Sequence, residues 1–149
     1  MILTGEQIRK EIKENNIFIT PFHESYINPD SYDISIGEKL FFYSDDIVLD
    51  SRNKNIINCV NIPKEGYILQ KNKFYYAESL EKIQTMKFVP LLHSKSGVAR
   101  LGLFVHITAD LLDRGHNGNV LLQLYSSNNV RIYPNQRLGQ LSFWRVQEK

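Results

Sequence analysis

The chain has 149 residues, which suits one domain with a self-sufficient core. Its 18 basic and 16 acidic residues leave a net charge of +2, too small an excess for a protein that wraps duplex DNA. No stretch approaches the roughly 18 consecutive apolar residues of a membrane span, and no basic segment precedes an apolar one at the start. We therefore expect a single cytoplasmic domain, residues 1–149, that binds neither DNA or RNA nor a membrane.

The first predicted element is a short N-terminal helix. Thr4 is a suitable N-cap residue, and Gln7 follows three residues later, as a capping box requires. Leu3, Ile8 and Ile12 supply apolar contacts at helical spacing, and an asparagine pair ends the run. We expect this to be the only substantial helix of the chain.

After the helix, the apolar pattern changes to the period of two that is typical of strands. Short β-branched and aromatic runs alternate with turns rich in Asn, Asp, Pro and Gly. The predicted strands are residues 17–19, 32–36, 40–43, 46–49, 67–70, 74–77, 102–108, 120–125, 130–133 and 138–144. The least patterned stretch, 51–61, predicts a surface loop. Many short strands separated by turns indicate an all-β sandwich, jelly roll or barrel.

Cys59 is the only cysteine, so neither an intrachain disulfide nor a cysteine zinc site is possible. Free cysteines are among the most buried residue types, and we expect Cys59 to be a small buried apolar side chain. The four histidines are scattered and show no spacing typical of zinc ligands.

Residues 95–102 carry the first chemical signal. Lys95, Ser96, Gly97 and Arg100 combine two cations, a hydroxyl and a glycine in one short segment between apolar stretches. A glycine lets backbone N–H groups approach a ligand closely, and the two cations can form charge-assisted hydrogen bonds to phosphate oxygens. The segment is a candidate phosphate-binding loop; the alternative is a solvated turn that leads into a strand.

Three further segments carry polar residues at the ends of predicted strands. Residues 28–37 place Asp33 where a strand begins. Residues 108–119 form a polar hairpin that contains carboxylates, an imidazole and glycines. Residues 133–143 form a proline turn that re-enters a strand.

Together, in this order and at this spacing, the four segments resemble the motifs of the dCTP deaminase and dUTPase superfamily. The likeness covers nearly the whole chain. The opening residues with their helix, and the run 99–109, are similar to the dCTP deaminase-like branch. The resemblance implies an all-β distorted jelly roll or β-barrel with a short N-terminal helix. It also implies a homotrimer with active sites at the subunit interfaces.

The resemblance further implies roles for individual residues, with a pyrimidine deoxynucleoside triphosphate as the ligand. The implied substrate-binding residues are Lys95, Ser96, Gly97, Arg100, Ala109, His116, Gln136 and Gln140. Asp33 would lie close to the metal–phosphate region. The implied cofactor is Mg²⁺, held largely by the triphosphate and by water, which agrees with the lack of a carboxylate cluster in the sequence. Asp113 would orient and activate the attacking water.

Several positions depart from the deaminase pattern. Gln123 occupies the place of the deaminase glutamate, and a primary amide cannot accept and return a proton near neutral pH. It can still form hydrogen bonds to a pyrimidine, as donor and as acceptor. Gly97 after Ser96 is similar to dUTPases, and His116 replaces an aromatic residue under the deoxyribose. The sequence also lacks a glycine-rich fifth motif or a long C-terminal tail, which predicts a more open site.

These features favour hydrolysis of a pyrimidine deoxynucleoside triphosphate, with dUTP to dUMP and pyrophosphate as the leading hypothesis. Deamination of dCTP to dUTP and ammonia is the first alternative, because the overall likeness is to deaminases. A non-catalytic nucleotide-binding or regulatory homologue is the second. The choice between uracil and cytosine stays open at this level.

Overall fold

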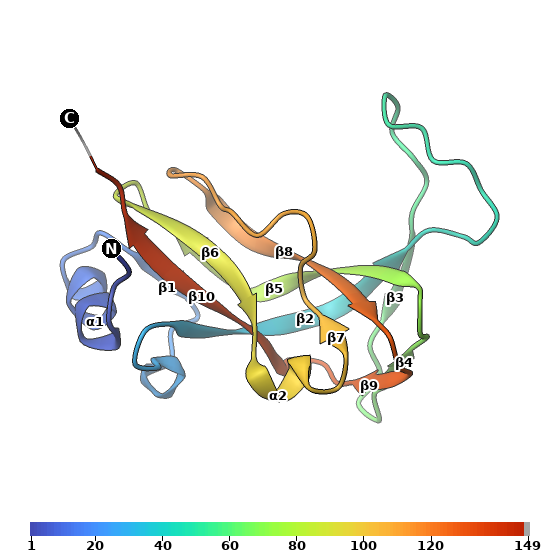
Figure 1. Cartoon of the computed structure of the whole chain (residues 1–149), viewed down its shortest axis with the longest axis horizontal. Coiled ribbons are helices and arrows are strands. Elements are labelled where there is room, and N and C mark those ends of the chain that lie inside the picture. The colour runs from blue at the N-terminus through green and yellow to red at the C-terminus, as the bar shows by residue number, and fades with distance from the viewer. Residues whose placement is uncertain (148–149) are drawn as a thin grey trace.

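The computed structural model describes residues 1–147 of the chain. Its strands greatly outnumber its helices, as predicted, and the arrangement is shown in Figure 1. The elements in chain order are α1 (Gly5–Lys13), β1 (Phe18–Thr20), the 3-10 helix η1 (Glu24–Tyr26), β2 (Tyr32–Phe42), β3 (Asn58–Asn61), β4 (Tyr67–Leu69), β5 (Phe74–Gln84), β6 (Phe88–Ser94), α2 (Ser96–Ala99), β7 (Leu103–Phe104), β8 (Asn117–Ser126), β9 (Val130–Ile132) and β10 (Arg137–Arg145).

One antiparallel sheet of eight strands forms the body of the molecule. Its main path runs β6-β10-β2-β5-β8-β7, with β1 paired to β5 and β3 paired to β2. The sheet curls into a nearly closed barrel, and β4 and β9 form a separate two-stranded sheet at one end (Figure 1). The predicted all-β barrel with one short N-terminal helix is confirmed. The homotrimer stays a prediction, since a single chain does not test it.

The interior of the barrel is filled by side chains that alternate along the strands. Along β5, Tyr75, Ala77 and Ile83 are buried while their sequence neighbours are more exposed. Such alternation is what a half-buried strand requires, because successive side chains point to opposite faces.

No helix among residues 1–147 is long and apolar enough to cross a membrane.

Helix α1 begins and packs as its sequence predicts. The Thr4 hydroxyl accepts a hydrogen bond from the Gln7 backbone N–H, and the Gln7 side chain accepts one from the Thr4 N–H, which completes the capping box. Leu3 and Ile8 are fully buried, and Ile12 packs against the core at its edge.

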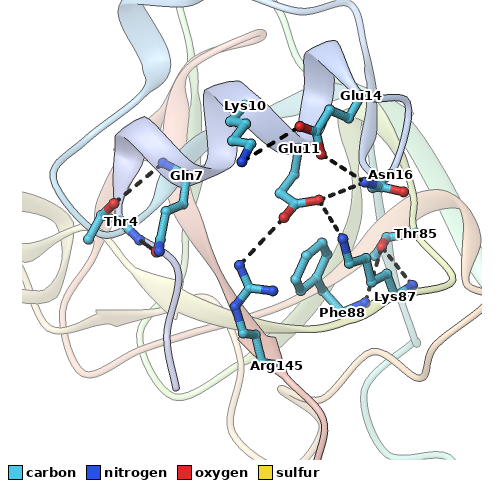
Figure 2. A network of polar contacts seen from close by, with 10 residues as sticks. All are labelled: Thr4, Gln7, Lys10, Glu11, Glu14, Asn16, Thr85, Lys87, Phe88 and Arg145. Carbon is cyan, nitrogen blue, oxygen red and sulfur yellow. Dashed lines mark hydrogen bonds and ion pairs between the residues drawn. The ribbon is translucent and has the colours of Figure 1, made fainter.

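A buried carboxylate also ties the helix to the sheet, as Figure 2 shows. The side chain of Glu11 is only 6% exposed and accepts hydrogen bonds from Lys87 at 3.0 Å and Asn16 at 2.7 Å. Arg145 on β10 approaches the other carboxylate oxygen at 3.5 Å. Burial acts to raise the pKa of Glu11, but the hydrogen bonds from Lys87 and Asn16 outweigh it and lower that pKa. Lys87 precedes β6, so this Glu11 cluster joins α1 to β10 and to the start of β6.

Several strand predictions were wrong in detail. Residues 46–49 are not a strand; they belong to a long excursion between β2 and β3. The predicted strand 102–108 shrinks to Leu103–Phe104, and the predicted loop 51–61 ends in β3. Cys59 lies on β3 and is exposed, so the expectation that it is buried was also wrong. Strand β3 is short and, among residues 1–147, pairs only with β2, so its side chains are largely exposed. The apolar pattern of the sequence does not reveal that a strand lies at an edge.

Two other errors have clear causes. The apparent turn at Gly37 does not divide two strands, because β2 runs through it with a register shift between Ile36 and Leu40. Such a bulge keeps a strand continuous while it bends. Strand β6 was missed altogether. It contains Pro90, which weakens the strand pattern but is tolerated on an edge strand such as β6.

Candidate functional site

The first motif, the candidate phosphate loop and the C-terminal turn motif meet at one concave surface. This polar pocket has a volume of about 420 Å³ and is lined by Asn28, Pro29, Asp30, Ser31, Lys95, Ser96 and Gln140. Pairing of β10 with both β2 and β6 brings these distant segments together. Lys95, Ser96 and Gln140 thus lie in one pocket.

The carboxylate of Asp33 lies behind this pocket and organises it. Asp33 is 1% exposed, and a buried carboxylate must be paired to remain charged. Its Oδ1 accepts a hydrogen bond from Asn28 Nδ2 at 2.7 Å. Its Oδ2 accepts from Lys95 Nζ at 2.5 Å and from Arg137 Nη1 at 3.2 Å. The Arg137 guanidinium also lies over the Tyr26 ring, 4.9 Å from its centroid. Asp33 therefore holds Lys95 in the pocket wall.

The same contacts bear on metal binding. Both Asp33 oxygens already accept hydrogen bonds, so the carboxylate is poorly suited to bind a cation directly. Residues 1–147 contain no group of three His, Cys, Asp or Glu side chains that could hold a metal ion. The residues present do not form a protein cage for Mg²⁺. The predicted neighbourhood of Asp33 to a metal–phosphate group stays a prediction.

Gln140 joins two sides of the polar pocket. Its Oε1 accepts a hydrogen bond from the Ser31 hydroxyl at 2.7 Å, and its Nε2 donates one to the Ser94 carbonyl at 3.1 Å. Both ends of the amide are therefore used within the protein. We expect Gln140 to shape the pocket more than to select the ligand.

The candidate phosphate loop forms the single helical turn α2, with Lys95 at its N-cap position. Ser96, Gly97 and Arg100 are exposed around this turn. A Cβ added at Gly97 would meet no atom within 4 Å, so the space beside this backbone is open to a ligand. Gly97 and Arg100 lie next to the polar pocket in sequence but are not part of its lining.

A second concavity, the hairpin pocket, has a volume of about 320 Å³. Its lining consists of Ala109, Leu111, Leu112, Asp113, His116, Val120, Leu121 and Gln123. Apolar walls with a few polar groups are typical of a pocket for a flat organic ligand such as a base. Four predicted site residues are brought together here, namely Ala109, Asp113, His116 and Gln123.

The hairpin pocket is shaped by a tight turn at its tip. Gly115 has φ +88°, a conformation that favours glycine, and its N–H donates to the Thr85 carbonyl at 2.8 Å. The His116 N–H donates to the Asp113 carbonyl at 3.1 Å, and its ring Nε2 lies 3.2 Å from the Gly118 carbonyl oxygen. The Asp113 side chain is exposed at the pocket and accessible to water.

Gln123 lies on β8 and is half-buried in the pocket wall. Its Oε1 accepts hydrogen bonds from the Ile107 N–H, the Thr108 N–H and the Thr108 hydroxyl, each at 3.3 Å. The Gln123 N–H itself donates to the Val105 carbonyl at 2.9 Å. Gln123 thus fastens the segment 105–108 to β8.

Gln136 lies outside both pockets. Its side-chain oxygen accepts a hydrogen bond from the Tyr133 N–H at 3.0 Å, within the proline turn. Sequence reasoning missed Asn28, Ser31 and Arg137, which line or support the polar pocket. A signal was available, because each stands in one of the four polar segments.

The chain thus combines a nearly closed β-barrel with a polar pocket that holds a fixed lysine and an apolar pocket that carries an aspartate. Residues 2–146 match the dCTP deaminase-like family, and the chain belongs to this family. The chain is 37% identical over 147 residues to a dUMP-forming dCTP deaminase of Hathewaya histolytica, with 99% of this chain and 84% of that protein covered.

Two solved structures share the fold. The dCTP deaminase of Agrobacterium tumefaciens superposes with a TM-score of 0.73 at 18% identity, over 95% of this chain. The match covers 47% of that longer chain, so the chain spans about half its length. The EIAV dUTPase superposes with a TM-score of 0.50 at 17% identity, over 74% of this chain and 91% of that one. At these identities the likeness concerns the fold alone.

Proposed function

We propose that this protein hydrolyses dUTP to dUMP and pyrophosphate and does not deaminate dCTP. The observation that carries the proposal is that two polar residues with different chemistry line the hairpin pocket. Asp113 offers a carboxylate, whereas Gln123 offers only an amide. Hydrolysis needs a base for water, which a carboxylate supplies. Deamination needs a group that moves protons at the ring, which an amide does not supply.

The chemical requirements of hydrolysis each have a candidate residue. Asp113 accepts a proton from a water molecule while the water oxygen attacks the α-phosphorus. Pyrophosphate is the leaving group. The leucine-rich walls of the hairpin pocket receive the pyrimidine. His116, which also lines this pocket, is proposed to stack on the sugar.

The polar pocket is the proposed place for the triphosphate. Lys95 and Ser96 line it, and Arg100 follows them on the exposed turn. Asp33 restrains Lys95, so less side-chain entropy is lost when the ammonium group binds phosphate. Mg²⁺ is proposed as the counter-ion of the triphosphate, held by phosphate oxygens and water.

The two pockets share no lining residue. In Figure 1 the tip of the hairpin before β8 lies in the upper part of the view, whereas the turn α2 lies at its lower edge. A homotrimer would let the hairpin pocket of one subunit and the polar pocket of another bind the same nucleotide. The separation of the two pockets within one chain therefore supports the predicted active sites at subunit interfaces.

The test is an incubation of pure protein and Mg²⁺ with dUTP, dCTP or dTTP, with separate assays for pyrophosphate and ammonia. We expect dUMP and pyrophosphate from dUTP and no ammonia from dCTP. Ammonia release from dCTP at an ordinary enzymatic rate would overturn the proposal. Thermal stabilisation by a nucleotide without any turnover would point to a binding protein instead.

The second candidate is conversion of dCTP to dUMP, as in the relative from Hathewaya histolytica. The identity to that dUMP-forming deaminase over 99% of this chain favours it. This candidate requires an acid/base other than Gln123. Release of ammonia and dUMP in equal amounts from dCTP would establish it.

A further inference from the structure

We infer that Gln123 acts toward the ligand only as a hydrogen-bond donor and that it makes the hairpin pocket select uracil over cytosine. The inference rests on the proposed function, because it assumes that a pyrimidine occupies this pocket. It goes further by assigning the base and the residue that selects it. The sequence alone left the amide of Gln123 free to act as donor or acceptor.

The orientation of the amide follows from its neighbours. Two backbone N–H groups, of Ile107 and Thr108, point at one end of the Gln123 side chain at 3.3 Å. Backbone N–H groups can only donate, so that end must be the carbonyl oxygen. The reversed amide would place its NH₂ group against two donors and leave all of them unpaired.

The same contacts use up the acceptor capacity of Gln123. A carbonyl oxygen has two lone pairs, and Oε1 already receives these two N–H groups and the Thr108 hydroxyl. The opposite end of the amide is the NH₂ group. For that group, the described residues 1–147 provide no hydrogen-bond partner. Gln123 lines the hairpin pocket, and the inference is that this NH₂ group is the end that a ligand there meets.

The inference places this donor beside C4 of the base, where uracil and cytosine differ. Uracil carries a carbonyl oxygen at C4, which accepts a hydrogen bond, and cytosine carries an amino group there, which donates. A fixed donor beside C4 binds uracil and opposes cytosine, because two donors face each other and neither is satisfied. One such mismatch is worth about tenfold or more in affinity.

The restraint is built into the sheet. Gln123 stands on β8, opposite Tyr76 of β5, and its N–H is bonded to Val105. Strand pairing with β5 and the bond to Val105 therefore hold the Gln123 backbone, and the N–H groups of Ile107 and Thr108 hold its side-chain oxygen. Rotation of the amide by 180° to suit a different base would break these hydrogen bonds, so it costs free energy.

The experiment measures binding of the α,β-imido analogues of dUTP and dCTP by calorimetry with Mg²⁺, so that turnover does not enter. Wild-type protein is expected to bind the dUTP analogue about tenfold more tightly or better. Gln123→Glu keeps the shape and lets one oxygen accept the Ile107 and Thr108 N–H groups, while the other becomes an acceptor. The preference should then reverse toward the dCTP analogue.

Two variants complete the test. Gln140→Glu makes the same chemical change in the polar pocket, and we expect it to weaken both analogues by a similar factor without changing their ratio. Gln123→Met removes the donor without adding charge, and it should bring the ratio close to one even if Gln123→Glu does not fold. Melting curves on each variant verify the fold.

The outcomes separate the inference from the function it rests on. Equal binding of the two analogues by wild-type protein, or tighter binding of the dCTP analogue, overturns the donor assignment and leaves a pyrimidine nucleotide site in place. A ratio that survives in Gln123→Met overturns it as well. Binding of neither analogue overturns both the inference and the proposed function.

Discussion

At the scale of single residues, most polar side chains around the polar pocket already have hydrogen-bond partners within the protein. Asp33 is fully occupied by Asn28, Lys95 and Arg137, and Gln140 by Ser31 and Ser94. Polar groups that are satisfied inside the protein hold the pocket in shape before a ligand arrives. The exposed groups, Arg100 and Asp113, remain available for chemistry.

Arg100 is expected to contribute to phosphate affinity. Hydrogen bonds to charged groups contribute about 1.5–3 kcal/mol, so Arg100→Ala should weaken binding of a triphosphate by about tenfold or more. Calorimetric titration with the α,β-imido dUTP analogue measures this. Arg52→Ala, in the exposed excursion between β2 and β3, is the control and should bind like wild type. Unchanged affinity in a well-folded Arg100→Ala protein would show that the phosphate motif has been assigned wrongly.

Asp113 is expected to be needed for turnover and not for binding. Asp113→Asn keeps the side-chain shape but loses the base, so kcat should fall by about 100-fold or more while affinity stays nearly unchanged. Steady-state hydrolysis of dUTP gives kcat, and binding of the imido analogue gives affinity. Asp110→Asn is the matched control, because Asp110 lies in the same loop outside the pocket lining. Full activity in Asp113→Asn would exclude Asp113 as the base.

At the scale of elements, local signals and distant contacts decide different features. The capping box of α1 was predictable because its two hydrogen bonds join residues three apart. The Glu11 cluster was not, because Lys87 and Arg145 are far from Glu11 in the sequence and meet it only when β6 and β10 pair. The same holds for the bulge in β2, which lies where the sequence shows only a glycine.

Glu11 provides a pH-dependent contribution to stability. Its pKa is lowered in the folded protein, so the ionised form stabilises the fold above the unfolded pKa of about 4.3 and this stability is lost as the pH falls. Glu11→Gln should therefore lower the free energy of unfolding by about 1–2 kcal/mol at pH 7, and the difference from wild type should shrink below about pH 4.

Urea unfolding at several pH values measures this difference. Glu14→Gln is the control on the same helix, because Glu14 is more exposed and its pair with Lys10 at 3.7 Å is a surface ion pair. It should change stability by less than about 0.5 kcal/mol. An equal effect of Glu11→Gln at pH 7 and pH 3.5 would contradict the assigned ion pairs.

At the scale of the whole molecule, we predict a homotrimer. Apolar side chains outside the pocket linings are exposed, including Phe104 at 49% and Ile107 at 44%, and exposed apolar groups are suited to subunit contacts. Light scattering on a size-exclusion column should give three times the chain mass of 17.4 kDa. A monomer at micromolar concentration would contradict both the trimer and the shared-site arrangement.

The sequence by itself determined the family, the all-β fold, the capped N-terminal helix and many of the polar residues that line the two pockets, but not Asn28 or Ser31. These features depend on local patterns: side-chain alternation along a strand, a cap three residues from its partner, and short motifs whose residues are neighbours. Only the tertiary structure decided which side-chain oxygens already accept hydrogen bonds within the protein. The full pairing of Asp33 and the fixed amide of Gln123 arise from contacts between segments far apart in the chain, and strand register and barrel closure set those contacts.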